Sequence, residues 1–378
     1  MESKISRETL RTDKDGFSEP RQWPGQTYWI LLVTTIILLF SFTATFVVLM
    51  LTGKGKHNLS PEASSGRYTR DANLIKNTDK LSPNVNYNKE TLSPTVASMV
   101  NYLASDSPMI QLLGETINSN NTILVEVKDD CCVAIAEKDA DSKIYPASMT
   151  KVMSLLVACE NIDDLNEKLT ISEKNVTYAA ENEGSGVGLV ADEILTVKDL
   201  LYLTSYKSDT IAVMTLAEHI AGSEEGFVAL MNAKVRELGL SNTNFSNCTG
   251  LYDENNYTTC REMVAIMTHA LDNPFCRQLL TSYTGYPIKT NKHEEGLKIY
   301  SSWYSGRFKD NPKLETVVIR GGKTGYTDES GFCLVTYAES KSTGKKYINV
   351  IVGRPKGSGL NESISTAEVK KIYNTYAE

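Results

Sequence analysis

The sequence of 378 residues lacks the motifs that usually hold a metal or a redox cofactor. It contains no C-x-x-C pair, no H-E-x-x-H and no close pair of histidines, so we expect neither a metal site nor a cofactor. Only four histidines are present, at scattered positions, which disfavours a Ser-His-Asp triad. Excess positive charge is also lacking, because the net charge is −7. Phosphate binding needs a basic face, so we expect no nucleic-acid partner.

The seven cysteines do not suggest an obvious disulfide framework. Their odd number leaves at least one thiol free whatever pairs form. Cys159 and Cys333 lie inside apolar runs and are interpreted as small buried hydrophobic residues. Cys248 and Cys260 flank a polar loop, and the sequence leaves a disulfide between them open.

Charged residues are absent from residues 22–53, and this gap indicates a membrane segment. Residues 27–53 are long and apolar enough to cross a hydrocarbon core, which needs about 20 apolar residues. No small-residue cleavage site follows, so 27–53 is predicted to be an uncleaved transmembrane anchor. We expect residues 1–26 to lie in the cytoplasm and the body to lie outside, as a single-pass protein of the cell membrane. Residues 54–118 are predicted to form an extracellular stalk with lead-in helices, and 119–378 the folded domain.

The order of the expected elements predicts the fold class. Apolar patterns predict strands at both ends of the domain, at 122–127, 131–137, 314–324, 331–340 and 345–355. They predict helices mainly between these strands, at 149–160, 195–205, 208–222, 224–240 and 261–273, with a last helix at 365–378. The regular strand-helix alternation of a parallel doubly wound sheet is missing. We therefore predict a mixed α/β fold of the α+β type, with an antiparallel sheet flanked by helices and an all-helical region.

A Ser-x-x-Lys pair, Ser148 and Lys151 in "YPASMTKVMSLL", is the first candidate for catalytic chemistry. The spacing places the lysine one helical turn after the serine on the same helix face. A lysine held against a core loses part of its preference for the protonated form and can take the serine proton. The alternative is a helix N-cap beside a solvated lysine. The spacing alone does not decide, because Ser342 and Lys345 repeat it in what reads as a polar turn.

Two further motifs add weight to the first pair. Lys323-Thr324-Gly325 ends a predicted strand, where the lysine supplies positive charge and the threonine hydroxyl can bind a carboxylate. The glycine lets a substrate backbone lie along this strand edge. Ser208 stands at the predicted start of a helix, where its hydroxyl can relay a proton or merely cap the helix. The set S-x-x-K, S-x-N, K-T-G is typical of penicillin-binding proteins and class A β-lactamases.

From about residue 122 to its end, the chain resembles the D-alanyl-D-alanine carboxypeptidase family, the low-molecular-weight penicillin-binding proteins. The stretches that carry the likeness are "DADSKIYPASMTKVMS", "LAEHIAGSEEGFVALMNAKVRELGLSNTNF", "NCTGLYDENNYTT" and "GGKTGYTDESGFCLV". The resemblance implies a β-lactamase/transpeptidase-like fold and a serine peptidase that trims the terminal D-alanine from peptidoglycan stem peptides. It also implies β-lactam antibiotics as covalent inhibitors.

The resemblance assigns a role to each motif residue. Ser148 would be the acylated nucleophile, Lys151 its general base, and Ser208 the relay that protonates the departing D-alanine. Substrate binding would fall to the residues Thr210, Lys323, Thr324 and Gly325. The backbone N–H groups of Ser148 and Tyr326 would form the oxyanion hole.

Thr210 departs from the family pattern. The middle motif usually ends in asparagine, whereas this chain reads Ser208-Asp209-Thr210, and threonine cannot offer the donor and acceptor of an amide together. A non-catalytic scaffold therefore remains an alternative. A β-lactamase is the other alternative, but Glu181 and Glu183 do not show the Glu-x-x-x-Asn spacing that its deacylating carboxylate usually has.

Overall fold

The computed structural model describes residues 111–112, 117–129, 131–305, 308, 314–353 and 362–378. The predicted transmembrane anchor and almost all of the stalk lie outside these residues. Of the described helices, none is long and apolar enough to cross a membrane. The helices are η4 (Ala147–Met149), α4 (Thr150–Asn161), α5 (Glu173–Glu181), α6 (Val197–Lys207), α7 (Thr210–Ala221), α8 (Glu224–Glu237), α9 (Cys260–Asp272), α10 (Pro274–Thr281) and α11 (Glu362–Tyr376).

A six-stranded sheet forms the centre of the domain. Its strands are β1 (Gln111–Leu112), β2 (Asn121–Val127), β3 (Cys132–Lys138), β8 (Val317–Thr327), β9 (Gly331–Ser340) and β10 (Lys346–Val352). They lie in the order β1-β3-β2-β10-β9-β8, and every pair except β1-β3 is antiparallel. The predicted antiparallel sheet with flanking helices is therefore confirmed. Its topology leaves β8 as an edge strand, so one side of β8 is free to meet other parts of the chain or a ligand.

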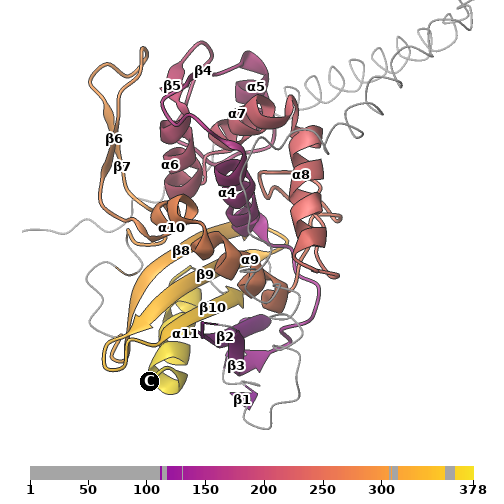
Figure 1. Ribbon diagram of the computed structural model, residues 1–378, viewed down its shortest axis with the longest axis vertical. Helices are drawn as coiled ribbons and strands as arrows, with labels where there is room; N and C mark the ends of the chain where they lie inside the picture. Colours follow the sequence, from indigo (N-terminus) through magenta and orange to yellow (C-terminus); the bar gives the residue numbers. More distant parts are fainter. Residues whose placement is uncertain (1–110, 113–116, 130, 306–307, 309–313, 354–361) are drawn as a thin grey trace, which may run out of the picture. The chain divides into compact units, whose positions relative to one another are not determined.

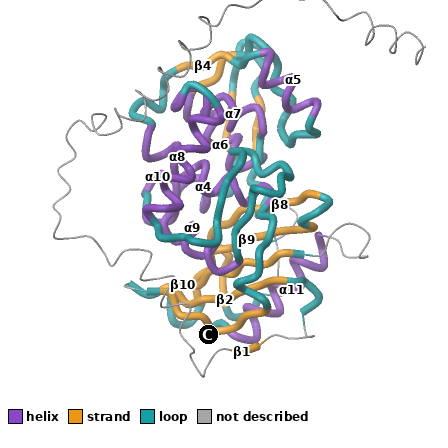
Figure 2. The backbone as a smooth tube through the Cα atoms, turned by 90° about the vertical axis from the view of Figure 1, so that its right-hand side faces the viewer, coloured by secondary structure: helices purple, strands orange, loops and turns teal. Residues whose placement is uncertain are grey.

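Helices cover both faces of this sheet (Figures 1 and 2). One face packs against α4, α9 and α10 in a large core that also includes the middle helices α6, α7 and α8. On the opposite face, α11 packs in a smaller core around Tyr347 and Tyr373. Figure 1 shows α6, α7 and α8 gathered at one end of the sheet, with α4 among them.

The sequence pattern anticipated most of these elements. The predicted capping box is present at the start of α6, where the Thr196 hydroxyl accepts from the Asp199 backbone N–H and the Asp199 carboxylate accepts from Thr196. Two small two-stranded sheets were not predicted, β4 (Lys168–Thr170) with β5 (Ile194–Thr196) and β6 (Tyr286–Ile288) with β7 (Leu297–Ile299). Helices α5 and α10 were also missed, because each is too short to show a clear period.

The lead-in helix prediction is wrong at the four residues of this segment that the structure describes, 111, 112, 117 and 118, none of which is helical. Residues 111–112 form strand β1, which pairs in parallel with Ala136 and Glu137 of β3. The edge of β3 offers unpaired backbone groups, and these outweigh the weak helical pattern of a short segment. All seven cysteines are free, so Cys248 and Cys260 are not bonded to each other. Cys333 is buried as expected, whereas Cys159 is only half-buried.

Candidate functional site

The Ser148 side chain is not a helix cap. It lies in the short helix η4, whose N-cap is Pro146, and neither η4 nor α4 has a side-chain hydrogen bond at its N-cap. The preceding residue Ala147 has a φ of 48°, in the left-handed region that residues with a side chain rarely adopt. Ser148 is half-buried at the point where α4 meets the end of β8. Its hydroxyl is therefore available for chemistry, and the N-cap interpretation fails.

Lys151 is the partner of Ser148. Its Nζ donates to the Ser148 Oγ at 3.2 Å and to the carbonyl oxygen of Thr249. The side chain is 1% exposed, and burial lowers the pKa of the ammonium to about 8, although the nearby Cys248 and Asp209 oppose this shift. A lysine with a pKa near 8 has a substantial neutral fraction at neutral to mildly alkaline pH. It can therefore accept the proton of the serine hydroxyl.

The loop 247–251 builds the acceptor for Lys151. The Asn247 Oδ1 accepts from the Gly250 N–H at 2.7 Å and from the Thr249 hydroxyl at 3.1 Å, so one amide shapes the whole turn. Gly250 has a φ of +77°, and a Cβ atom there would collide with the Ala147 carbonyl oxygen. Only glycine allows this close approach to the nucleophile's backbone. The loop thereby fixes the Thr249 carbonyl against the lysine.

Contacts of Cys248 with Glu224 and Ser154 hold the same loop as well. The Cys248 N–H donates to the Glu224 carboxylate at 3.1 Å, and its thiol lies 3.4 Å from the same oxygen. The Ser154 hydroxyl of α4 donates to the Cys248 carbonyl at 2.7 Å. Because burial raises the pKa of the Cys248 thiol well above its ordinary value, the thiol stays protonated and acts as a donor.

Ser208 does not start a helix as expected. It ends α6 in the left-handed conformation, with φ 57° and ψ 30°, while Asp209 caps α7 by accepting from the Ala212 N–H at 2.9 Å. This sharp turn directs the Ser208 hydroxyl at Lys323, whose Nζ donates to it at 2.9 Å. The middle motif and the strand motif are thus joined by a direct hydrogen bond.

Thr210 lies beneath a glycine-rich loop. Its backbone N–H donates to the Ser185 carbonyl at 2.8 Å, and a Cβ atom at Gly184 would lie 2.9 Å from the Thr210 Oγ1. A second glycine, Gly186, packs in the same way against the Asp209 carboxylate. The Thr210 side chain is 1% exposed. Its role in substrate binding therefore stays a prediction, and Glu181 and Glu183 lie exposed near this loop.

The K-T-G motif lies on the edge strand β8, as predicted. Lys323 is fully buried and donates to Ser208 and to its neighbour's carbonyl oxygen, at 2.9 Å each. A Cβ atom at Gly325 would lie 3.0 Å from the Ser148 backbone nitrogen, so the strand edge touches the nucleophile. The next residue is Tyr326. The structure thus brings the Ser148 N–H next to the strand segment that carries the Tyr326 N–H.

Ser302 is a site residue that sequence reasoning missed. Its hydroxyl lies 3.0 Å from the Thr324 Oγ1, and its N–H donates to the Tyr206 carbonyl of α6 at 3.0 Å. Thr249 was missed as well, since its contribution is a backbone carbonyl. A hydroxyl in an irregular loop and a main-chain oxygen give no sequence signal, so only the fold reveals them.

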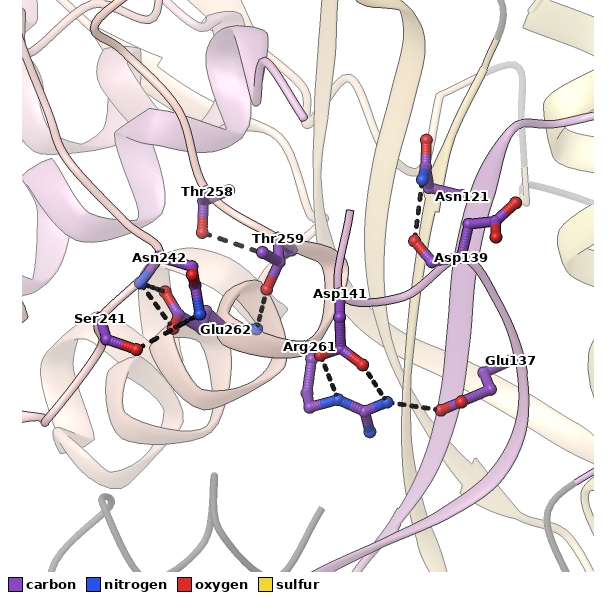
Figure 3. A network of polar contacts seen from close by, with 10 residues as sticks. All are labelled: Asn121, Glu137, Asp139, Asp141, Ser241, Asn242, Thr258, Thr259, Arg261 and Glu262. Atoms are coloured by element: carbon purple, nitrogen blue, oxygen red, sulfur yellow. Dashed lines mark hydrogen bonds and ion pairs between the residues drawn. The ribbon is translucent and has the colours of Figure 1, made fainter. Parts of the chain in front are cut away.

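The segment that leads to Ser148 is anchored on α9 (Figure 3). The Arg261 guanidinium bonds both oxygens of Asp141, at 2.7 and 2.9 Å, and Glu137 at 2.8 Å. Its backbone N–H donates to the Ala140 carbonyl, and Ile144 forms a bridge with Thr258. A bidentate pair fixes direction as well as distance. The chain therefore enters η4 along a defined path.

No cluster of three or more histidine, cysteine or acidic side chains suited to a metal occurs in the described part of the chain. The two described cavities, of about 130 and 210 Å³, are lined by residues of the sheet, α9, α10 and the loops beside β8. None of the predicted site residues lines either cavity. The candidate site is therefore defined by the contacts of its own residues, where η4 and the turn at Ser208 meet the edge strand β8.

Comparisons with known proteins agree on one family. The sequence profile of the D-alanyl-D-alanine carboxypeptidases matches residues 107–356. The D-alanyl-D-alanine carboxypeptidase DacF of Bacillus subtilis is 33% identical over 241 residues, which is 64% of this chain and 59% of that protein. A D-alanyl-D-alanine endopeptidase of Escherichia coli is 28% identical over 50% of this chain and 57% of its own length. The chain thus spans less than two thirds of these curated relatives.

Solved structures show the same fold. The crystal structure of the Streptomyces K15 DD-transpeptidase has a TM-score of 0.58 at 23% identity, over 68% of this chain and 97% of that chain. Penicillin-binding protein 5 of Haemophilus influenzae has a TM-score of 0.56 at 27% identity, over 68% and 69%. In both comparisons the likeness covers 68% of this chain, and it shows that the chain shares their fold.

Proposed function

Because the chain belongs to the D-alanyl-D-alanine carboxypeptidase family, we propose that it removes the terminal D-alanine from peptidoglycan stem pentapeptides through an acyl-enzyme on Ser148. The observation that carries this proposal is the buried Lys151, whose Nζ lies 3.2 Å from the Ser148 Oγ and whose pKa is lowered to about 8. A lysine surrounded by water holds its proton more tightly and is a poor base for a serine hydroxyl. The same nucleophile would be acylated by β-lactam antibiotics.

In the first half of the proposed reaction, neutral Lys151 takes the Ser148 proton as the Oγ attacks the carbonyl carbon between the two D-alanines. The resulting oxyanion is held by the N–H groups of Ser148 and Tyr326, where the negative charge develops. Collapse of the tetrahedral intermediate breaks the C–N bond. The departing amine takes a proton through Ser208, and the D-alanine leaves.

In the second half, a water molecule attacks the acyl-enzyme and Lys151 takes its proton. The ester bond breaks, Ser148 regains its proton, and the shortened stem peptide is released. Lys323 and Thr324, with the neighbouring Ser302 hydroxyl, would hold the terminal carboxylate of the substrate during the first half. This accounts for a cation that is fully buried at the strand edge.

The location of the enzyme is part of the proposal. We propose that residues 27–53 anchor the chain in the cell membrane, with the N-terminus in the cytoplasm and the catalytic domain, residues 119–378, outside. The substrate would then lie on the same side as the site. The stalk, residues 54–118, would set the distance between membrane and cell wall.

Two alternatives differ from this proposal in what they do with a β-lactam. A β-lactamase would hydrolyse it quickly, and a non-catalytic scaffold, which the unusual Thr210 favours, would not react. An endopeptidase, as one relative is named, would use the same acyl-enzyme on a cross-linked peptide.

One experiment distinguishes the proposed carboxypeptidase from the β-lactamase and from the non-catalytic scaffold. The body from residue 60 onward is incubated with labelled penicillin beside its Ser148→Ala variant, and D-alanine release from a pentapeptide is followed in parallel. We expect stable labelling that depends on Ser148, together with released D-alanine. Rapid turnover of penicillin would favour the β-lactamase. The absence of both signals would rule out an enzyme of this kind.

A further inference from the structure

A buried amide connects the helix that follows the nucleophile to the loop that holds the base. Asn256 is 2% exposed and lies in the sequence between the loop 247–251 and α9. Its Oδ1 accepts from the Ser246 N–H at 3.3 Å, and its Nδ2 donates to the Thr150 Oγ1 at 3.0 Å. A backbone N–H can only donate, so the oxygen of the amide faces Ser246 and its nitrogen faces Thr150. Both ends of this side chain are therefore in use.

Thr150 is the contact on the catalytic side. It is the first residue of α4, it is 1% exposed, and it stands between Ser148 and Lys151 in the sequence. One peptide unit joins it to the lysine, and the serine is two residues before it. Because peptide units are rigid, a shift of Thr150 moves both reacting side chains. The hydrogen bond from Asn256 thereby fixes the end of α4 that carries the catalytic pair.

Ser246 is the contact on the loop side. It comes three residues before Thr249, whose carbonyl oxygen accepts from the Lys151 Nζ. The Ser154 hydroxyl, one turn further along α4, holds the same loop by donating to the Cys248 carbonyl at 2.7 Å. The loop is thus attached to α4 at two points that lie four residues apart on one helix face. The attachment through the buried amide is the one at the nucleophile's end of the helix.

The backbone beside Asn256 is itself held on both sides. Tyr257 exchanges N–H···O bonds with Asn244, at 2.9 Å each, and Thr258 exchanges them with Ile144, at 3.1 and 2.8 Å. The first of these partners belongs to the segment that leads to the loop, and the second belongs to the segment that leads to the nucleophile. The amide therefore projects from a fixed backbone, which allows it to hold the two parts at one distance.

We propose that Asn256 is a positioning residue for the base Lys151, because it ties the loop to the first residue of α4. The tie keeps water away from the amine and keeps the amine aimed at the Ser148 hydroxyl. This inference rests on the proposed function and names a residue that supports the same site. Asn256 acts through its two hydrogen-bond partners and leaves the reacting atoms untouched.

Loss of this tie should make Lys151 easier to protonate. Burial lowers the pKa of its ammonium from 10.5 to about 8. In Asn256→Ala the bond from Ser154 to the loop remains, so water should reach the amine although the loop stays in place. The pKa of the lysine then rises toward its ordinary value, and less of the neutral amine is present at neutral pH. The pH at which acylation reaches half of its maximal rate should therefore move upward.

The test measures the rate at which labelled penicillin acylates the full-length chain, kept in detergent, over a series of pH values. We expect Asn256→Ala to raise the midpoint of the profile by about one pH unit and to lower the rate at neutral pH about tenfold, since one unit is a tenfold change in the neutral fraction. The rate at high pH should fall much less. Asn255→Ala is the matched control, because this neighbouring asparagine is exposed, and it should keep the original profile.

The midpoint separates positioning from general damage. A protein that is merely destabilised loses rate by the same factor at every pH, whereas a changed base moves the midpoint. Thr150→Val removes the hydroxyl partner with little change of shape and should shift the midpoint in the same direction. Combined with Asn256→Ala, it should shift the midpoint little further, because both changes remove one bond. An unmoved midpoint in Asn256→Ala would overturn the inference while the proposed function stands, and Thr150→Val is judged in the same way if the alanine variant does not fold.

A second measurement separates this inference from the proposed function. If penicillin does not label the unaltered chain at all, the proposed function fails. Lys151 is then titrated by its reaction with acetic anhydride, and the peptide that carries it is quantified by mass spectrometry at each pH. A higher pH for this reaction in Asn256→Ala supports the inference, and equal reactivity of the lysine in both proteins overturns it.

Discussion

The same Ser-x-x-Lys spacing occurs twice in this chain, at Ser148–Lys151 and at Ser342–Lys345. In the first, the lysine is 1% exposed and its Nζ lies 3.2 Å from the serine hydroxyl. In the second, both side chains are exposed in the turn between β9 and β10, and the Ser342 N–H merely donates to the Ser340 hydroxyl. The spacing is shared and the surroundings are not. What makes a base of a lysine is therefore its burial, not its distance in sequence from a serine.

The neighbourhood of the first pair explains the difference. Lys151 stands on a helix whose other side faces the core, and the loop 247–251 closes over it with one carbonyl acceptor. Lys345 follows Gly344, which has a φ of +71° and opens the turn to water. Burial disfavours the charged ammonium, so Lys151 gives up its proton more readily than a lysine in water does.

Replacing each serine in turn should give the largest difference in activity between the two Ser-x-x-Lys pairs. Ser148→Ala deletes the nucleophile and should lower penicillin labelling and D-alanine release by about a thousandfold or more. Ser342→Ala should leave both unchanged, because that hydroxyl only supports a turn. Labelling by a fluorescent penicillin on a denaturing gel measures the effect. A labelled Ser148→Ala protein would show that another residue is acylated.

Replacing each lysine in turn should again affect only the first Ser-x-x-Lys pair, with a smaller loss of acylation rate. Lys151→Ala leaves the serine without its base and should slow acylation by about a hundredfold to ten-thousandfold. Lys345→Ala should have no measurable effect on the rate. Stopped-flow acylation by a chromogenic β-lactam measures both, with circular dichroism as a check on folding. Equal effects of the two substitutions would mean that burial does not distinguish them.

The pH dependence should report the first lysine alone. Neutral Lys151 is the reactive form, and its fraction rises with pH until the pH passes the pKa of about 8. The acylation rate should therefore fall about tenfold for each pH unit below 8 and level off above it. A pH series of the acylation rate tests this, with Lys345→Ala as the matched control that keeps the same profile. A flat profile between pH 6 and 9 would contradict a lysine base.

The sequence predicted the side chains of this site better than its backbone groups and loop hydroxyls. Side chains in fixed motifs on regular elements, such as Ser148, Lys323 and Thr324, lie where the pattern placed them. Backbone groups and loop hydroxyls such as those of Thr249 and Ser302 were missed. Their position depends on how distant segments pack, and no residue type reveals it.

The turn at Ser208 shows that backbone conformation is also hard to predict from the sequence. The pattern indicated a helix start, but it did not indicate that Asp209 caps the helix and leaves Ser208 in a left-handed conformation. Local propensity predicts that a helix forms, whereas tertiary contacts decide at which residue it begins or ends. The fold class was easier to predict, because the positions of several strands and helices contribute to it together.

Weakening the loop 247–251, which covers Lys151, should make the surroundings of this lysine more like the open turn that holds Lys345. Cys248→Pro removes both hydrogen-bond donors to Glu224 and should lower the free energy of unfolding by about 1–3 kcal/mol. We expect acylation to slow by about tenfold as the Thr249 carbonyl loses its fixed position. Cys248→Ser keeps both donors and is the control. Thermal unfolding and acylation rates of both variants measure the effect, and an unchanged Cys248→Pro protein would show that the loop needs no such anchor.

The smallest effect is expected at Thr210, the departure from the family pattern. Thr210→Asn restores an amide that can donate and accept at once. The side chain lies against Gly184, so the longer asparagine must either displace this loop or turn toward the candidate site. If it turns toward the site, D-alanine release should rise by roughly two- to fivefold, with the Ser148 labelling site unchanged. Gly184→Ala, which crowds the same contact without adding an amide, should not raise the rate. A gain in both variants would assign the effect to the loop, and a loss in Thr210→Asn alone would mean that the threonine is adapted to this site.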